Sequence, residues 1–233
     1  MKKFISIMIT VIMVVTIAGC NRVVTGNKQA DDALTAINSI VSANKDKLGF
    51  HKALNHWGLA LPGEDKFEWS KDTSSNVADY AMVIKAEPFI NAGLDTTKLN
   101  SDWLFNEAAD ENGTLVPARV IHPFDISDKK ETSQGSEDAF RRLLKQKPDV
   151  VLYHSELQHY RLMLDDGFEV QWTEKLGLND ADMIFVIAAD PLIEAGLDIT
   201  KLQDSGWIFK EKGTDPTGMG ENPNQLIKIY KLS

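Results

Sequence analysis

Cysteine is almost absent from this sequence: Cys20 is the only one in 233 residues. A single cysteine excludes an internal disulfide, so the hydrophobic core alone must stabilise the folded part of the chain. A domain of roughly 200 residues buries enough surface to fold without such support. A lone thiol in an exported protein is reactive unless it has a use.

Basic residues are also scarce, with 25 Lys and Arg against 34 Asp and Glu and a formal net charge of -9. No run of Lys or Arg interrupts this balance, and polyanions are poor partners for such a surface. We therefore expect no nucleic-acid partner. Beyond the first twenty residues, no apolar run approaches the length needed to cross a bilayer.

Several catalytic motifs are missing. The sequence has no Walker loop, no G-x-S-x-G elbow, no G-x-G-x-x-G after a predicted strand and no C-x-x-C pair. The string HSELQH at 154–159 separates its histidines by five residues, whereas a zinc-protease motif requires four. The sequence gives no positive evidence for an enzyme, and we expect a non-catalytic role.

The N-terminus has the pattern of an export signal. Lys2 and Lys3 precede an apolar run from Phe4 to Gly19, which ends in small residues before Cys20. The residues Ile17-Ala18-Gly19-Cys20 resemble the lipobox of bacterial lipoproteins. The resemblance implies that residues 1–19 are removed and that acyl chains such as palmitate on Cys20 hold the protein at the extracytoplasmic face of the cell membrane. Removal of the leader leaves 23 basic and 34 acidic side chains, a net charge of -11.

The rest of the sequence repeats itself at an offset of 103 residues. Residues 78–99 and 181–202 are identical at 14 of 22 aligned positions. The same offset pairs further residues upstream: His51 with His154, His56 with His159, and Trp69 with Trp172. Self-similarity of this extent indicates a tandem duplication.

Each copy predicts the same series of elements. Apolar residues at helical spacing, between 34 and 41 and between 140 and 144, predict an opening amphipathic helix. Two short runs around turn residues then predict a hairpin, at 57–69 and 160–172. The continuous apolar runs that follow predict central strands covered on both faces, and a last strand closes each copy; these are Tyr80–Ala86, Met183–Ala189, Ala118–Phe124 and Gln225–Leu232.

A short helix is predicted directly after each central strand. Glu87 and Asp190 each precede a proline, which predicts an acidic cap followed by proline in the first turn. Gly93 and Gly196 then predict left-handed helix ends. Asp95 and Asp198 are placed to cap a further short turn.

The predicted fold class is α+β, with mainly antiparallel sheet. Two tandem copies of an α-β-β-β-α-β module would pack with pseudo-twofold symmetry, and a single continuous sheet is one arrangement open to them. The predicted organisation is a signal peptide at 1–19, the lipidated Cys20 and a tether at 20–30, module 1 at 31–126, a linker at 127–136 and module 2 at 137–233.

The paired histidines suggest a metal or haem site, because imidazole is the commonest metal ligand. A site within one copy is disfavoured, since five residues along a helix turn by about 500° and leave the rings of His51 and His56 about 140° apart. A site across the two copies would use His56 and His159. Structural roles for duplicated histidines are the alternative.

Two further candidate sites follow from the repeat. Trp57 and Tyr160 come directly after the matched histidines, so His56, Trp57, His159 and Tyr160 are predicted to line a ligand cleft between the modules. Glu87 and Asp190 stand at matching strand ends and would form a two-carboxylate site if they faced one another. Helix capping already explains both acids.

We therefore expect a lipid-anchored extracytoplasmic protein that binds a small ligand or an envelope protein without a cofactor. One alternative is a metal- or haem-binding lipoprotein that uses His56 and His159. The other is an envelope enzyme that uses Glu87 and Asp190.

Overall fold

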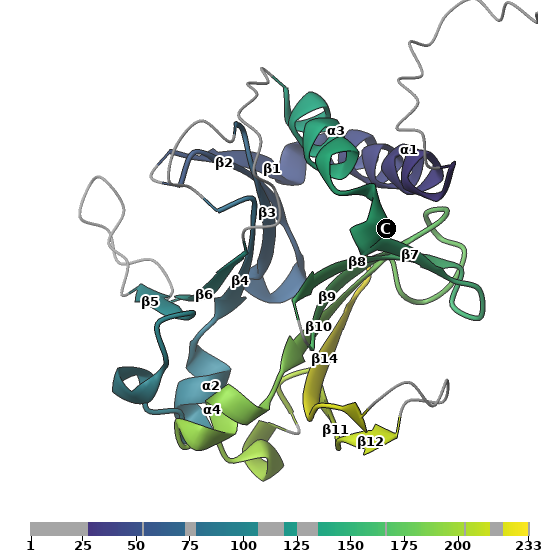
Figure 1. Cartoon of the computed structure of the whole chain (residues 1–233). Coiled ribbons are helices and arrows are strands. Elements are labelled where there is room, and N and C mark those ends of the chain that lie inside the picture. Colours follow the sequence, from purple (N-terminus) through teal and green to yellow (C-terminus); the bar gives the residue numbers. More distant parts are fainter. Residues whose placement is uncertain are drawn as a thin grey trace, which may run out of the picture.

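The computed structural model describes residues 28–52, 54–72, 78–106, 119–124, 135–165, 167–202, 204–214 and 221–232. Within these ranges the chain forms four α-helices and two six-stranded antiparallel sheets, which confirms the predicted α+β class (Figure 1). No helix of the described part is long and apolar enough to span a membrane. Cys20 and all but the last residues of the predicted tether and linker lie outside the described residues.

Each half of the chain builds its own sheet. Sheet 1 has the order β1-β2-β3-β4-β6-β5 and consists of β1 (Leu48–His51), β2 (His56–Ala60), β3 (Lys66–Ser70), β4 (Tyr80–Lys85), β5 (Leu104–Asn106) and β6 (Arg119–Phe124). Sheet 2 has the order β7-β8-β9-β10-β14-β11 and consists of β7 (Val151–His154), β8 (His159–Asp165), β9 (Phe168–Thr173), β10 (Met183–Ala188), β11 (Trp207–Lys210) and β14 (Gln225–Tyr230). A small hairpin joins β12 (Gly213–Thr214) to β13 (Glu221–Asn222).

The two halves do not share one continuous sheet. Each sheet has an apolar inward face, and the two faces approach one another through aromatic contacts such as Phe67 with Phe185, whose ring centroids are 6.5 Å apart. Side chains alternate along a strand, so every second residue points outward, away from this core. Face-to-face packing buries large side chains that edge-to-edge pairing would leave in water.

The predicted hairpins and central strands are present, but the sequence missed the edge strands β1, β5, β7 and β11. These strands are only three or four residues long, at or below the shortest apolar run that marks a strand, and they are partly exposed. In β1, for example, Gly49 and Phe50 are both exposed.

The helices α1 (Lys28–Ala43) and α3 (Ser136–Gln146) lie together at one end of the molecule, and each covers the sheet built by the other half (Figure 1). Helix α1 packs against β7 and β9, whereas α3 packs against β3. Phe140 of α3 lies at the centre of the core, with its ring 5.4 Å from Trp69 and 5.9 Å from Trp172.

The short helices α2 (Glu87–Asn91) and α4 (Asp190–Glu194) meet at the opposite end (Figure 1). The amide of Asp95 donates to the carbonyl oxygen of Ala195 at 2.9 Å, and that of Asp198 donates to Ala92 at 2.8 Å. As predicted, Gly93 and Gly196 end the helices with φ values of 96° and 99°. The core is thus closed at both ends by helices.

Asp95 and Asp198 cap the following 3-10 turns as predicted. The carboxylate of Asp95 accepts from the amide of Thr97, and that of Asp198 from the amide of Thr200, both at 3.1 Å. Exposed hydrogen bonds to threonine are also the main reason why the pKa values of both aspartates are lowered.

Candidate functional site

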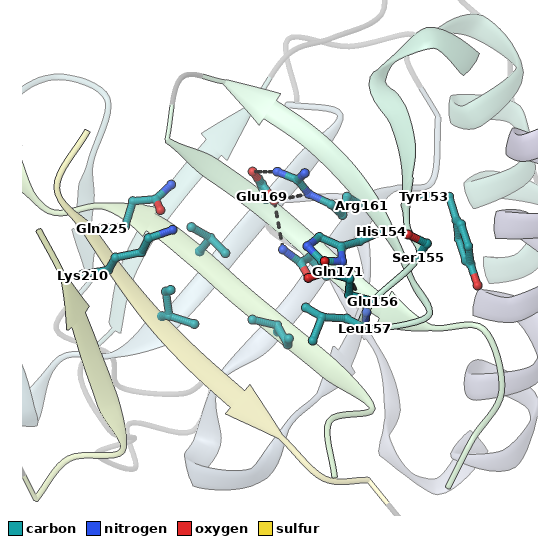
Figure 2. A pocket seen from close by; sticks show the side chains of 13 residues that line it. Tyr153, His154, Ser155, Glu156, Leu157, Arg161, Glu169, Gln171, Lys210 and Gln225 are labelled. Atoms are coloured by element: carbon teal, nitrogen blue, oxygen red, sulfur yellow. Dashed lines mark hydrogen bonds and ion pairs between the residues drawn. The ribbon is translucent and has the colours of Figure 1, made fainter. Parts of the chain in front are cut away.

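The outward face of sheet 2 is hollowed into an open concavity of about 610 Å³ (Figure 2). This volume falls within the range of small-molecule sites. All six strands of the sheet or their turns contribute to its lining: Tyr153, His154, Ser155, Glu156, Leu157, Arg161, Glu169, Gln171, Ile184, Val186, Lys210, Gln225 and Ile227.

The floor on β10 and β14 is apolar. Ile184 and Val186 alternate with the inward-facing residues of β10, and register pairing places Ile227 of β14 beside Val186. Two neighbours on the same face, Ile208 and Ile229, are 53% and 48% exposed. The outward face of β10, the predicted central strand of the second half, therefore lies next to exposed isoleucine side chains of β11 and β14.

A polar network covers the adjoining strands β8 and β9. The guanidinium of Arg161 forms two hydrogen bonds with the carboxylate of Glu169, one of which is 2.8 Å long between Nε and Oε2. The side-chain amide of Gln171 donates to the same Oε2 at 3.0 Å. A bidentate pair fixes both partners in one geometry, so this network forms a rigid border to the apolar floor.

The two ends of the concavity are different (Figure 2). Exposed Lys210 and its register partner Gln225 lie together at one end. The β7–β8 turn, with His154 and exposed Glu156 and Leu157, forms the other. The amide of Leu157 donates to Nδ1 of His154 at 3.3 Å, which makes Nδ1 an acceptor and leaves Nε2 as the protonated nitrogen of a neutral ring.

A second polar cluster occupies the outward face of sheet 1. Its centre is Glu68, which is 1% exposed. Nδ1 of His51 lies 3.2 Å from Oε2 of Glu68, and Nδ1 of His56 lies 3.4 Å from the same oxygen. Burial raises the pKa of Glu68, but the hydrogen bonds and charges of the two histidines outweigh burial and lower the pKa overall.

The structure does not bring the four predicted cleft residues together. His56 and His159 are on the outward faces, where their Nε2 atoms lie 2.7 Å and 2.9 Å from the carbonyl oxygens of Ala78 and Ala181. Trp57 and Tyr160 follow them in sequence and therefore point inward. Trp57 packs on Phe50 at 5.2 Å, and Tyr160 lies 6.4 Å from Trp172.

The segment from His51 to His56 belongs to a hairpin and not to a helix. The two histidines are register partners across the β1–β2 hairpin, on the same face. The predicted separation of about 140° between the two rings was therefore wrong, because a hairpin brings residues five apart side by side. Even so, among the described residues no three His, Cys, Asp or Glu side chains form a group that could hold a metal.

The two predicted acids are at the helix starts but do not cap them. The side chain of Glu87 is 65% exposed and pairs with Lys85 at 3.0 Å. Asp190 accepts a hydrogen bond of 2.6 Å from the side chain of Asn224. Both acids are already within the first helical turn, and neither α2 nor α4 has a side-chain cap.

Sequence reasoning missed the network on β8 and β9. Glu169 and Gln171 alternate with the apolar residues Phe168, Val170 and Trp172, which is the pattern of a strand with one polar face. This alternation was a usable signal. Comparison with protein-family models, curated proteins and solved structures gave no match, so the site is interpreted from its own geometry.

Proposed function

We propose that this protein is a non-catalytic lipoprotein that binds an amphipathic small ligand on the outward face of sheet 2. The observation that carries the proposal is the concavity of about 610 Å³, in which an apolar floor adjoins a rigid polar network. Apolar surface bordered by polar side chains is typical of ligand-binding grooves. Ile208 and Ile229, each about half exposed, extend the apolar surface beside the floor.

The face is divided into an apolar part and a polar part, which supports an amphipathic ligand. Its apolar part would lie over β10 and β14, against Ile184, Val186 and Ile227. Its polar part would extend over β9 and β8 toward Gln171 and Arg161. Six strands at a spacing of roughly 4.8 Å give a face about 24 Å wide, enough for an elongated molecule.

The proposed location is the extracytoplasmic face of the cell membrane, with a lipid on Cys20 as the anchor. The lipobox-like residues 17–20 support this location, as does the lack of any other cysteine. A single acyl chain binds a membrane only marginally, so stable attachment requires more than one. The ligand face would then be displayed outside the cell membrane.

We also propose that the two halves are copies of one module, related by a pseudo-twofold axis. The sequence repeat at offset 103 supports this origin, and the same strand order in the two sheets agrees with it. The outward faces have since diverged. Gly58, Glu68 and Ala81 of sheet 1 stand at the positions of Arg161, Gln171 and Ile184 in sheet 2.

Fluorescence titration with 1-anilinonaphthalene-8-sulfonate, an amphipathic probe, tests the binding face. We expect the protein to bind the probe and Ile227→Lys to weaken binding about tenfold or more, because an apolar contact of ~1.5–3 kcal/mol is lost. The matched control is Ile90→Lys, at a 43% exposed isoleucine of α2. It should leave the affinity within about twofold.

Circular dichroism must show that both variants keep the native fold, because unfolded apolar surface also binds this probe. Absence of probe binding to the native protein would contradict the proposal. Equal weakening by the two substitutions would also contradict it, since the probe would then have no preference for the floor of sheet 2.

A further inference from the structure

The Glu68 cluster on sheet 1 lies outside the proposed ligand face and contains a buried carboxylate beside two histidines. Glu68 and His56 are each 1% exposed, and the side chain of His51 is 35% exposed. A buried carboxylate needs compensation by hydrogen bonds or opposite charge. Gly58 leaves room for it, because a Cβ atom there would lie only 3.2 Å from Cγ of Glu68.

The hydrogen bonding of His56 determines which of its nitrogens carries a proton. Nε2 lies 2.7 Å from the carbonyl oxygen of Ala78, and a carbonyl oxygen only accepts. Nε2 must therefore be the donor. In a neutral ring, Nδ1 would then hold a lone pair.

That lone pair would face a carboxylate. Nδ1 of His56 is buried without a well-formed hydrogen bond, and Oε2 of Glu68 lies 3.4 Å from it. Two acceptors at this distance repel one another in a site from which water is excluded. A proton on Nδ1 turns the repulsion into a charge-assisted contact.

We propose that His56 and Glu68 form a buried proton-binding site, in which His56 is an imidazolium ion paired with the Glu68 carboxylate at neutral pH. His51 completes the site by donating from Nδ1 to the same carboxylate oxygen. Among the described residues, neighbouring segments carry other charged groups. Asp79 follows Ala78 and is 2% exposed, the carboxylate of Asp72 accepts a hydrogen bond of 3.0 Å from Asn55, and the guanidinium of Arg142 donates to the carbonyl oxygen of Ser70 at 3.0 Å. Ser70 of β3, the register partner of His56, carries no charge.

Sheet 2 supplies a natural comparison. His159 has the same contact, with Nε2 2.9 Å from the carbonyl oxygen of Ala181. Gln171 stands 103 positions after Glu68, and the side-chain partners of the His159 ring are the neutral amides of Asn179 and Gln171. Burial is the main cause that lowers the pKa of His159. We therefore expect a neutral His159 at pH 7, in contrast to the proposed charged state of His56.

The test is long-range ¹H–¹⁵N NMR of the protein labelled at histidine, recorded at pH 7. We expect both ring nitrogens of His56 to give signals of protonated nitrogen, and only one of the two in His159. The reciprocal variants provide the controls. Glu68→Gln should convert His56 to one protonated nitrogen, and Gln171→Glu should convert His159 to two.

A wild-type His56 with one unprotonated nitrogen would overturn the proposal. A His56 signal that changes when EDTA is added would also overturn it, because the bound cation would then be a metal ion. If Glu68→Gln does not fold, the wild-type spectrum and Gln171→Glu still decide: a His159 that stays neutral beside a glutamate contradicts the proposed role of the carboxylate.

Discussion

The indole of Trp172 donates a hydrogen bond of 3.0 Å to the carbonyl oxygen of Ala33, 139 residues earlier in the chain. Trp69 makes the corresponding bond of 2.9 Å to Ser136. The first pair fastens α1 to sheet 2, and the second fastens α3 to sheet 1. Each half of the chain therefore completes the core of the other.

Trp172→Phe should destabilise the whole molecule. The substitution removes a buried hydrogen bond and part of a core side chain, so we expect a loss of about 1–3 kcal/mol in the free energy of unfolding. Because α1 and α3 cross between the halves, urea unfolding should remain a single transition by circular dichroism and by the fluorescence of the remaining tryptophans. Two separated transitions would show that the halves unfold independently.

Gly93→Ala and Gly196→Ala, compared with a control, should separate two losses of stability: one from close packing and one from backbone conformation. A Cβ atom at either glycine would lie 3.1 Å from the carbonyl oxygen of the other. Gly177→Ala is the control, because Gly177 also has a positive φ, 71°, but nothing within 4 Å. All three substitutions should lower the free energy of unfolding by about 1–2 kcal/mol, because alanine is strained in the left-handed conformation.

Gly93→Ala and Gly196→Ala should lower the free energy of unfolding by about 1 kcal/mol or more beyond the loss caused by Gly177→Ala. The added Cβ atoms force the helix ends of α2 and α4 apart. Chemical denaturation of the three variants measures the difference. Equal losses would mean that the contact between α2 and α4 adjusts without cost.

Asp65→Asn should be among the most harmful single substitutions. The Asp65 carboxylate is fully buried and accepts hydrogen bonds from Nζ of Lys228 at 2.6 Å and from Oη of Tyr230 at 2.9 Å. An amide there leaves Lys228, 13% exposed, without its counter-charge, and breaking a buried pair costs about 3–5 kcal/mol. Asp180→Asn makes the same chemical change at an exposed site and should stay within about 0.5 kcal/mol of wild type in thermal unfolding. A small effect at Asp65 would argue against this contact between the two halves.

The stability contribution of Glu68 should depend on pH. Burial opposes ionisation of Glu68, but His51 and His56 lower its pKa below the ordinary value of 4.5. A lowered folded-state pKa means that the contribution is complete above the unfolded-state pKa and is lost as the pH falls through the folded-state pKa. We expect wild type to exceed Glu68→Gln in stability at pH 6–7 and the difference to shrink below about pH 4. A difference that is constant from pH 7 to pH 3 would contradict this assignment.

Cys20→Ser should release the protein from the membrane. Without the lipid, no apolar run beyond the leader at residues 1–19 is long enough to anchor the protein. Fractionation of cells that express each form should find wild type in the membrane fraction and the variant in the soluble fraction. Retention of the variant in the membrane would contradict lipid anchoring at Cys20.

The sequence by itself determined many of the local elements, although it did not reveal the four edge strands. Alternation and apolar runs located the hairpins and the central strands β4 and β10, and turn chemistry located Gly93, Gly196 and the caps Asp95 and Asp198. These features depend on residues close together in the chain, so their physical causes can be read from the sequence.

Only the tertiary structure decided which surfaces meet. An amphipathic stripe shows that α1 is buried but not which sheet buries it, and α1 covers the sheet of the other half. Strand alternation separates His56 from Trp57, and a hairpin joins His51 to His56, which a helical interpretation had kept apart. The concavity of sheet 2 depends on six strands whose members come from positions up to 74 residues apart, from Tyr153 to Ile227. No local pattern specifies such a surface, because it exists only when the sheet is assembled.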